Sequence, residues 1–144
     1  MTAYDNQNIF SKILRGEMPS INVYEDDMTF AFMDIMPKVD GHVLVLPKAA
    51  SRNILDIKLD DLHAVIATAQ KIAIAQMRAF SADGITIHQL SESAGGQVVF
   101  YTHIHVLPRH DRIALRTPTK LATSTALELH AEKIRSALKP VTLS

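Results

Sequence analysis

The segment from Asp60 to Ser81 carries apolar side chains at every third or fourth position, which is the spacing of one face of an α-helix. Aspartates at its start favour a helix N-terminus. β-Rich runs stand before and after this segment, so helices and strands are clustered rather than alternating. This order favours an α+β domain with a long central helix on a mainly antiparallel sheet. The apolar stripe consists of Leu62, Val65, Ile66, Ala69, Ile72, Ala73, Met77 and Phe80.

Five runs are predicted as strands because β-branched and aromatic residues dominate them and turn-forming residues separate them. The first three, NVYED, TFAFMDI and HVLVLPK, lie between Asn22 and Lys48 and favour an antiparallel meander. The last two, GITIHQL and QVVFYTHIHVLP, are joined by the glycine-bearing loop SESAGG, which favours a hairpin. A five-stranded sheet is therefore expected.

Two shorter helices are predicted near the ends of the chain. The run NIFSKILRG begins at Asn8 and is stopped by Gly16. A C-terminal helix is predicted over residues 118–138, with Thr117 as its N-cap and Pro118 at its first position. At 144 residues the chain has the usual size of one domain, so residues 1–144 are predicted to form a single domain.

Charge and composition exclude several classes of function. Basic and acidic residues number 15 each, so the formal net charge is zero and no basic field is available to hold a nucleic acid. Cysteine is absent, which excludes thiol nucleophiles and cysteine-bound zinc. The start MTAYDNQNIF does not resemble a signal peptide, and no run reaches the roughly 18 apolar residues of a membrane span. A soluble cytoplasmic protein without a cofactor or a membrane partner is expected.

The last predicted strand carries the strongest candidates for chemistry. In QVVFYTHIHVLPR successive side chains alternate between faces, so Tyr101, His103 and His105 are expected to share one face. Gly95 and Gly96 precede them, and free backbone amides at such a turn can cradle phosphate oxygens. Because a neutral imidazole is nucleophilic near pH 7, His103 is predicted to attack a phosphorus atom of a bound nucleotide.

Metal binding is the main competing use of a His-x-His pair. It requires a third ligand, which His42 could provide at the start of HVLVLPK. Neither histidine segment carries a nearby carboxylate that would complete a familiar ligand set. The sequence therefore favours the nucleophilic role of His103 over a metal site.

Several blocks of the chain resemble the histidine triad family, whose mark is His-φ-His-φ-His-φ-φ with φ apolar. Here the stretch from Tyr101 to Leu107 reads Tyr-Thr-His-Ile-His-Val-Leu. The blocks NIFSKILRGEMPS, VYEDDMTFAFMDIMP, GHVLVLPK and GGQVVFYTHIHVLPR follow one another in the order and spacing of that family, over roughly residues 8–110.

The resemblance implies a compact α+β domain that pairs with a second copy into a homodimer with one larger sheet. It also implies a hydrolase or transferase that cleaves at the α-phosphate of purine nucleotide derivatives through a nucleotidyl-histidine on His103. Nucleoside phosphoramidates are the favoured substrates. Dinucleoside polyphosphates remain an alternative, as does a nucleotide-binding module with weak or no catalysis.

The resemblance also assigns roles to other residues. His105 and His42 are implied to assist around the phosphate, and Asp34 to bind the ribose hydroxyls, whose hydrogens a carboxylate can accept. Donors to the phosphate are expected around Gly96 and Gln97, and Val98 is also expected to contact the nucleotide. The wall of the purine pocket is implied to consist of Ile9, Phe10, Ile13, Phe32, Ile35 and Leu44.

The chain departs from the family pattern at a few positions. Tyr101 replaces the first histidine, but the main-chain carbonyl of residue 101 is expected to hold Nδ1 of His103 whatever the side chain. Thr102 replaces an apolar residue, so its hydroxyl needs a partner. Val98 and Leu90-Ser91 stand where side-chain donors to phosphate are common.

Four further histidines lie outside the motif. His63, His110 and His130 are predicted to be surface or structural residues. His88 lies on the predicted strand GITIHQL, and its side chain could face either the site or the solvent.

Overall fold

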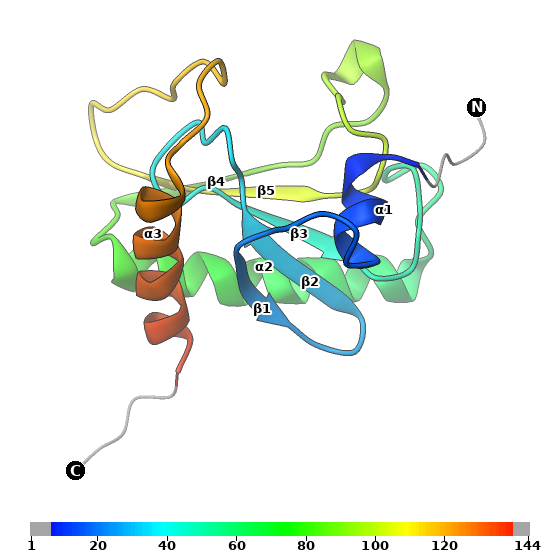
Figure 1. Ribbon diagram of the computed structural model, residues 1–144, viewed down its shortest axis with the longest axis horizontal. Helices are drawn as coiled ribbons and strands as arrows, with labels where there is room; N and C mark the ends of the chain where they lie inside the picture. Colours follow the sequence, from blue (N-terminus) through cyan, green and yellow to red (C-terminus); the bar gives the residue numbers. More distant parts are fainter. Residues whose placement is uncertain (1–6, 140–144) are drawn as a thin grey trace.

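The computed structural model describes residues 7–139, and it confirms the predicted α+β class (Figure 1). The helices, strands and one short 3₁₀ turn follow in the order α1 (Ile9–Leu14), β1 (Asn22–Glu25), β2 (Thr29–Met33), β3 (Val43–Pro47), α2 (Leu59–Ala79), β4 (Gly84–His88), η1 (Ser93–Gly95), β5 (Ile104–Arg109) and α3 (Ser124–Leu138).

The five strands form one antiparallel sheet in the order β1-β2-β3-β5-β4. The predicted meander is β1-β2-β3, and the predicted hairpin is β4-β5. Because β5 lies between β3 and β4, the hairpin extends the meander into a single sheet and leaves β4 at one edge. β3 and β5 therefore lie side by side within the sheet. β5 carries the motif histidine His105, and β3 begins directly after His42.

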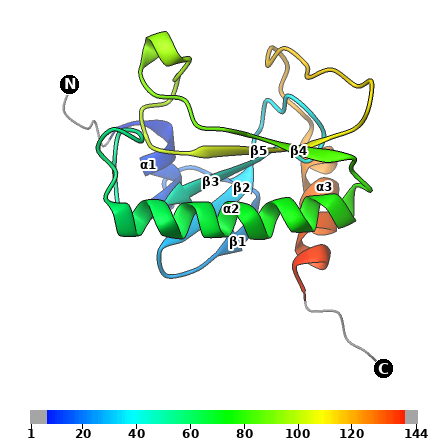
Figure 2. The same ribbon diagram turned by 180° about the vertical axis from the view of Figure 1, so that it is seen from behind.

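One face of the sheet is covered by α2 and α3. Figure 2 shows α2 running across the strands on this face. Its apolar stripe meets fully buried strand residues such as Val45 and Val106, and Ile134 of α3 joins the same core. This face has no room for a ligand because it is filled by the main hydrophobic core.

The opposite face is covered only in part, by the short helix α1. The side chain of Asn8 caps this helix by accepting from the amide of Ser11 at 2.9 Å. Gly16 ends it at φ +77, a left-handed conformation that favours glycine, and its amide donates to the carbonyl of Ile13. The helix therefore holds Phe10 against the sheet and leaves the neighbouring part of this face open.

Two predicted boundaries are wrong. The last strand begins at Ile104 rather than Gln97, because the amide of Thr102 pairs with the carbonyl of Ser51 instead of with a strand. The C-terminal helix begins at Ser124, with Thr123 as N-cap. Residues 118–123 are not helical, and the amide of Ala122 donates to the carbonyl of Ile35. In both cases backbone pairing with a distant loop replaces the predicted local structure.

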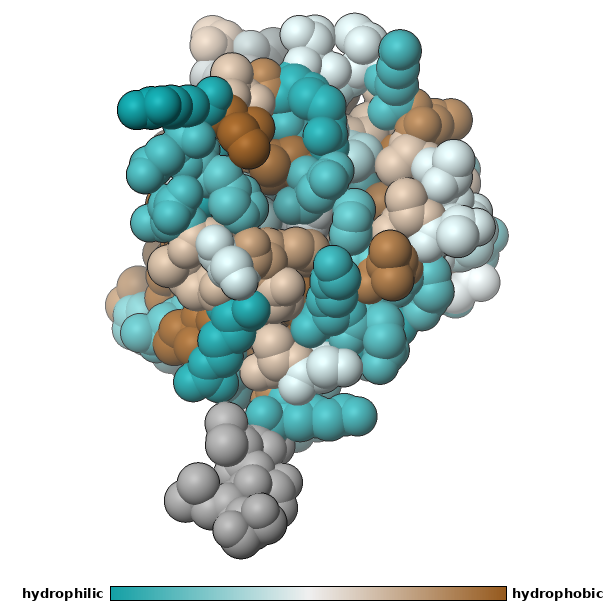
Figure 3. Space-filling view, turned by 90° about the vertical axis from the view of Figure 1, so that its left-hand side faces the viewer, coloured by the Kyte–Doolittle hydropathy of each residue, from teal (hydrophilic) through white to brown (hydrophobic). Residues whose placement is uncertain are grey.

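The end of the molecule that carries α3 shows mostly hydrophilic side chains with scattered apolar ones (Figure 3). No helix among residues 7–139 is both long and apolar enough to cross a membrane.

Candidate active site

A row of side chains crosses the open face of the sheet. Phe32 on β2 lies opposite Leu44 on β3, Leu44 lies opposite His105 on β5, and His105 lies opposite His88 on β4. Directly opposite residues of antiparallel strands point to the same face. The row therefore runs from an apolar side, which lies under α1, to two histidines at the edge of the sheet.

His103 lies just before β5 and is held in one orientation. Its Nδ1 is 2.6 Å from the carbonyl oxygen of Tyr101, as the sequence predicts. A carbonyl only accepts, so Nδ1 carries the ring hydrogen and Nε2 of the neutral ring keeps a free lone pair. The ring of Phe10 packs edge-on against it at 4.9 Å. Burial lowers the pKa of His103. The ring therefore stays neutral and nucleophilic at pH values where a free imidazole would be protonated.

The side chain of Tyr101 anchors the start of the histidine segment. It is almost fully buried, and its hydroxyl donates to the carbonyls of Pro47 and Lys48 at the end of β3. The hydroxyl of Thr102 also finds a partner, the hydroxyl of Ser51 at 2.6 Å. Both departures from the family pattern thus tie the segment before β5 to the chain that follows β3.

We expect Tyr101→Phe to destabilise the protein by about 1–3 kcal/mol, because the buried carbonyl of Pro47 loses its donor. The loss should appear as a lower free energy of unfolding in urea. Tyr24→Phe is the control, since the hydroxyl of Tyr24 lies in a more exposed position on β1. Equal stability of the Tyr101 variant and the unmodified protein would show that the anchor contributes nothing.

His42 and His105 form a chain of hydrogen bonds that assigns their hydrogens. The backbone amide of Lys38 donates to Nδ1 of His42 at 3.1 Å, so His42 carries its hydrogen on Nε2. That Nε2 donates to Nδ1 of His105 at 2.9 Å. His105 must then carry its hydrogen on Nε2, which leaves a fixed donor on the ring next to His103.

Burial keeps both of these rings neutral. It lowers the pKa of His42 to about 3 and that of His105 to about 2, with smaller contributions from nearby positive charges. Both residues therefore act near neutral pH as neutral donors and acceptors and not as cations.

The low pKa values predict a loss of stability in acid. Between pH 6.5 and pH 3 the unfolded chain binds protons at His42 and His105 while the native protein does not, so the free energy of unfolding falls as the pH falls. The slope should reach up to about 2.7 kcal/mol per pH unit. Urea unfolding at pH 7.5 and pH 5 measures it.

The variant His105→Asn should lose up to about 1.4 kcal/mol per pH unit of that slope, whereas the exposed His63→Asn should keep it. Asp34, whose pKa is raised by burial, acts in the opposite direction, so slopes of variants are compared rather than single values. If the free energy of unfolding of His105→Asn changed with pH as steeply as that of the unmodified protein, the claim that His42 and His105 stay neutral would be wrong.

Asp34 lies beside this chain, immediately after β2. Its Oδ1 accepts from the amide of Met36 at 2.8 Å, and its Oδ2 is 3.5 Å from Nε2 of His42. Burial is the largest influence on its carboxyl group and raises the pKa. Part of the carboxylate remains exposed on the open face, where it can accept hydrogen bonds from a ligand.

Asp34, His42 and His105 also lie close enough to share a metal ion, with one ligand atom of each within 4.8 Å of the others. The carboxylate that completes this group, Asp34, comes from outside the two histidine segments of the sequence. The donor set nevertheless does not fit a metal, because the Lys38 amide points at Nδ1 of His42 and keeps the ring hydrogen on Nε2. A ring nitrogen that carries hydrogen has no lone pair for a metal.

Comparisons with known proteins identify the family of this chain. Residues 15–112 match the HIT domain family. The chain belongs to the HIT family. A crystal structure of a Hit-like protein involved in cell-cycle regulation from Bartonella henselae is similar, with a TM-score of 0.89 and 50% identity, and the match covers 94% of this chain and 99% of that one.

Two named enzymes are also similar to this HIT protein. Adenylylsulfatase HINT3 of Arabidopsis thaliana is 32% identical over 135 residues, which cover 93% of this chain and 68% of that protein. The purine nucleoside phosphoramidase of Escherichia coli is 36% identical over 104 residues, which cover 70% of this chain and 86% of that protein. These two relatives are named for different activities.

The glycine loop of the HIT domain differs from the prediction. The amides of Gly95 and Gln97 donate to the carbonyl of Glu92, and the amide of Gly96 donates to the carbonyl of Ser93. The expectation that these amides are free to hold phosphate is wrong, because they close the turn around η1. Gly96 has φ +96, which explains the glycine there.

The side chain of Gln97 also serves the loop and not a ligand. Its Nε2 donates to the carbonyls of Arg52 and Val99, and its Oε1 accepts from the side chain of Asn53 and the amide of Glu92. All its hydrogen-bonding capacity is used. Val98 follows with 85% of its surface exposed, so it does not pack into the protein.

An ion pair that the sequence analysis missed fixes this loop. Arg52 contacts both carboxylate oxygens of Glu92, at 2.8 and 3.0 Å, and its guanidinium stacks on Phe100 at 4.2 Å. Forty residues separate the two charges in the chain, and no local pattern connects them. These contacts tie the loop to the segment that follows β3.

Five of the six apolar residues expected around the purine belong to one cluster on the open face. Ile35 is the exception, since half of its surface is exposed and it lies outside the cluster. The aromatic rings of Phe10 and Phe32 are in edge contact at 5.5 Å. The cluster includes Phe10, Phe32 and Leu44, with Ile9 and Ile13 packed against it.

The remaining histidines have different positions. His63 is exposed on α2. His110 bonds to the carbonyl of Phe80, and His130 packs edge-on against the ring of Phe80. These three are surface or structural residues, as predicted. His88 faces the site, because it is the strand partner of His105.

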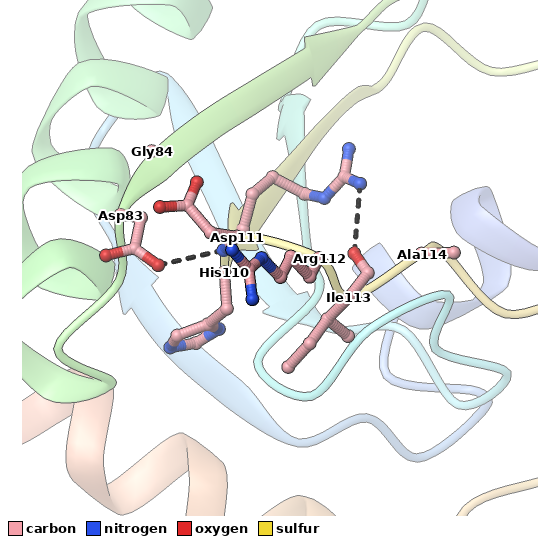
Figure 4. Close-up of a pocket in the computed structure, with 8 residues that line it drawn as sticks. Asp83, Gly84, His110, Asp111, Arg112, Ile113 and Ala114 are labelled. Atoms are coloured by element: carbon pink, nitrogen blue, oxygen red, sulfur yellow. Dashed lines mark hydrogen bonds between the residues drawn. The ribbon is translucent and has the colours of Figure 1, made fainter.

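A separate cleft of about 540 Å³ lies at the other end of β5 (Figure 4). Arg109 and Arg112 line it together with Asp83 and Asp111, and Asp83 accepts from the amide of Asp111 at 2.8 Å. Arg109 is four residues from His105, which is about 13 Å along an extended strand. The cleft is therefore not part of the histidine site.

Proposed function

We propose that the protein is a nucleotide hydrolase or transferase that cleaves at the α-phosphate of purine nucleotide derivatives through a nucleotidyl-histidine intermediate on His103. The observation that carries this proposal is the bond from Nδ1 of His103 to the carbonyl of Tyr101, because it leaves the lone pair of Nε2 free in a fixed direction. The cytoplasm is the proposed location.

In this reaction Nε2 of His103 attacks phosphorus and the leaving group departs. The hydrogen on Nε2 of His105 donates to a phosphate oxygen and stabilises the charge that develops there. Water then attacks the nucleotidyl-histidine and releases a nucleoside monophosphate. The backbone amides of Val98 and Val99, which donate to no other described residue, are further candidate donors.

The purine nucleotide is proposed to lie between the apolar cluster under α1 and Asp34, which accepts hydrogen bonds from the two ribose hydroxyls. Nucleoside phosphoramidates are the favoured substrates, and the similarity to the E. coli purine nucleoside phosphoramidase supports this choice. Dinucleoside polyphosphates are the alternative. The ratio of kcat/KM for an adenosine phosphoramidate and for diadenosine tetraphosphate decides between them.

Single-turnover mass spectrometry tests the mechanism. A short-lived mass increase equal to a nucleoside monophosphate group, located on the peptide that contains His103, is the expected result. Binding of adenosine monophosphate without any such adduct would support the second candidate, a nucleotide-binding module. Val98, which offers no side-chain donor, and the occupied amides of the glycine loop favour that candidate.

We also propose that the protein is a homodimer in which β4, an edge strand, pairs with β4 of a second copy. An exposed apolar side chain, Ile87, lies on this edge strand. Light scattering should give about twice the 15.9 kDa of one chain. Ile87→Lys should yield monomers and Leu121→Lys, on an exposed loop, should not. A monomeric unmodified protein would refute this assembly.

A further inference from the structure

The proposed reaction requires a proton for the leaving group, and three of the four histidines near the site are poorly suited to supply one. The ring hydrogens of His103 and His42 are already donated to Tyr101 and to His105. Burial keeps His42 and His105 neutral. A neutral imidazole is a far weaker acid than an imidazolium ion, so a different group is needed where the leaving group is an amine.

His88 is the fourth histidine, and strand pairing places it directly beside His105. The two residues are partners in the β4-β5 ladder, with no shift in register between Gly84 and His88. Partners of this kind have Cβ atoms about 4.5–5.5 Å apart and point to the same face. His88 is therefore one strand farther from the apolar cluster than His105, on the side away from the proposed purine pocket.

The surroundings of His88 differ from those of the other three rings. Its side chain is only partly buried, and among residues 7–139 it makes no hydrogen bond that would commit its ring nitrogens. His88 also lies near enough to His42 and His105 to affect their charge. Burial is the main cause of the low pKa of these two residues, and a positive charge on His88 lowers both pKa values further.

We propose that His88 is a catalytic residue that gives a proton to the leaving group and later takes one from the attacking water. This inference rests on the function proposed above.

The steps balance as follows. Nε2 of His103 forms a bond to phosphorus, the bond from phosphorus to the leaving group breaks, and the imidazolium form of His88 passes its proton to the leaving atom. Water then attacks phosphorus while neutral His88 accepts a proton from it. The bond from phosphorus to His103 breaks, His103 leaves as a neutral ring, and His88 returns to its starting form.

Two substrates with the same nucleotide and different leaving groups test this role. The amine of an adenosine phosphoramidate must gain a proton to leave, whereas the fluoride of adenosine 5′-phosphorofluoridate leaves as an anion. In His88→Ala, formation of the His103 adduct should slow by about 100-fold or more for the phosphoramidate. It should change by less than about 3-fold for the phosphorofluoridate. Rapid quench and mass spectrometry measure the adduct.

His88→Gln should behave like His88→Ala, and added imidazole should restore part of the rate with the phosphoramidate. His63→Ala, a change at an exposed histidine on the other side of the sheet, should leave both rates unchanged. Equal slowing with both substrates, or no slowing with either, would overturn the role of His88. Absence of any adduct in the unmodified protein would instead contradict the proposed function itself.

Discussion

Replacing His103 by alanine is expected to lower kcat/KM for an adenosine phosphoramidate by at least about 10³-fold. The variant loses the one imidazole whose Nε2 lone pair is left free by its hydrogen bond to the backbone. His105 cannot take over the attack, because its Nδ1 accepts from His42 and its Nε2 carries hydrogen. Steady-state release of the amine measures the loss.

Nucleotide binding separates a loss of chemistry from a loss of the pocket. The His103→Ala variant should bind adenosine monophosphate with a Kd within about tenfold of the unmodified value, since Asp34 and the apolar cluster remain. His63→Ala provides the control for the removal of an imidazole from an exposed position. Full activity of His103→Ala would refute the proposed nucleophile.

Gly41→Ala is expected to lower the free energy of unfolding by about 2–4 kcal/mol. Gly41 has φ +88, where a side chain costs energy. A Cβ at this position would also clash with Cε2 of the Phe80 ring. That ring cannot move away freely, since it packs against the core and against His130. The strained backbone of residue 41 and the overpacked ring of Phe80 therefore both lower the free energy of unfolding.

Gly84→Ala is the matched control, because a Cβ there meets nothing within 4 Å and the residue has no positive φ. Its unfolding free energy should change by less than about 0.5 kcal/mol. Gly41 directly precedes His42, so the Gly41 variant should also lose activity while it is still folded. Two variants of equal stability would show that Phe80 gives way to the added methyl group.

Most of the fold is predictable from local patterns. The spacing of apolar residues in α2 and the turn residues between strands are signals that act within one segment, and they place five strands and three helices correctly. The errors occur where a segment pairs with a distant loop. Thr102 pairs with Ser51, and Ala122 pairs with Ile35, so neither segment follows its own propensity.

The candidate site is predictable in its side chains and less so in its backbone. The sequence singles out His42, His103, His105 and Asp34, and the structure brings them together on one face. It does not reveal that the loop amides are occupied, since they pair within η1. It also leaves the direction of His88 open, because only the register of β4 against β5 decides which face a strand residue takes.

Main-chain groups decide which ring nitrogens carry hydrogen in the three site histidines. The carbonyl of residue 101 decides it for His103, and the amide of residue 38 decides it for His42 and, through His42, for His105. A substitution replaces a side chain but leaves these groups in the chain. A variant at position 101 can therefore lose the anchoring hydroxyl and still leave Nε2 as the attacking nitrogen of His103. In an engineered version of this protein, loop deletions would be the more damaging edits.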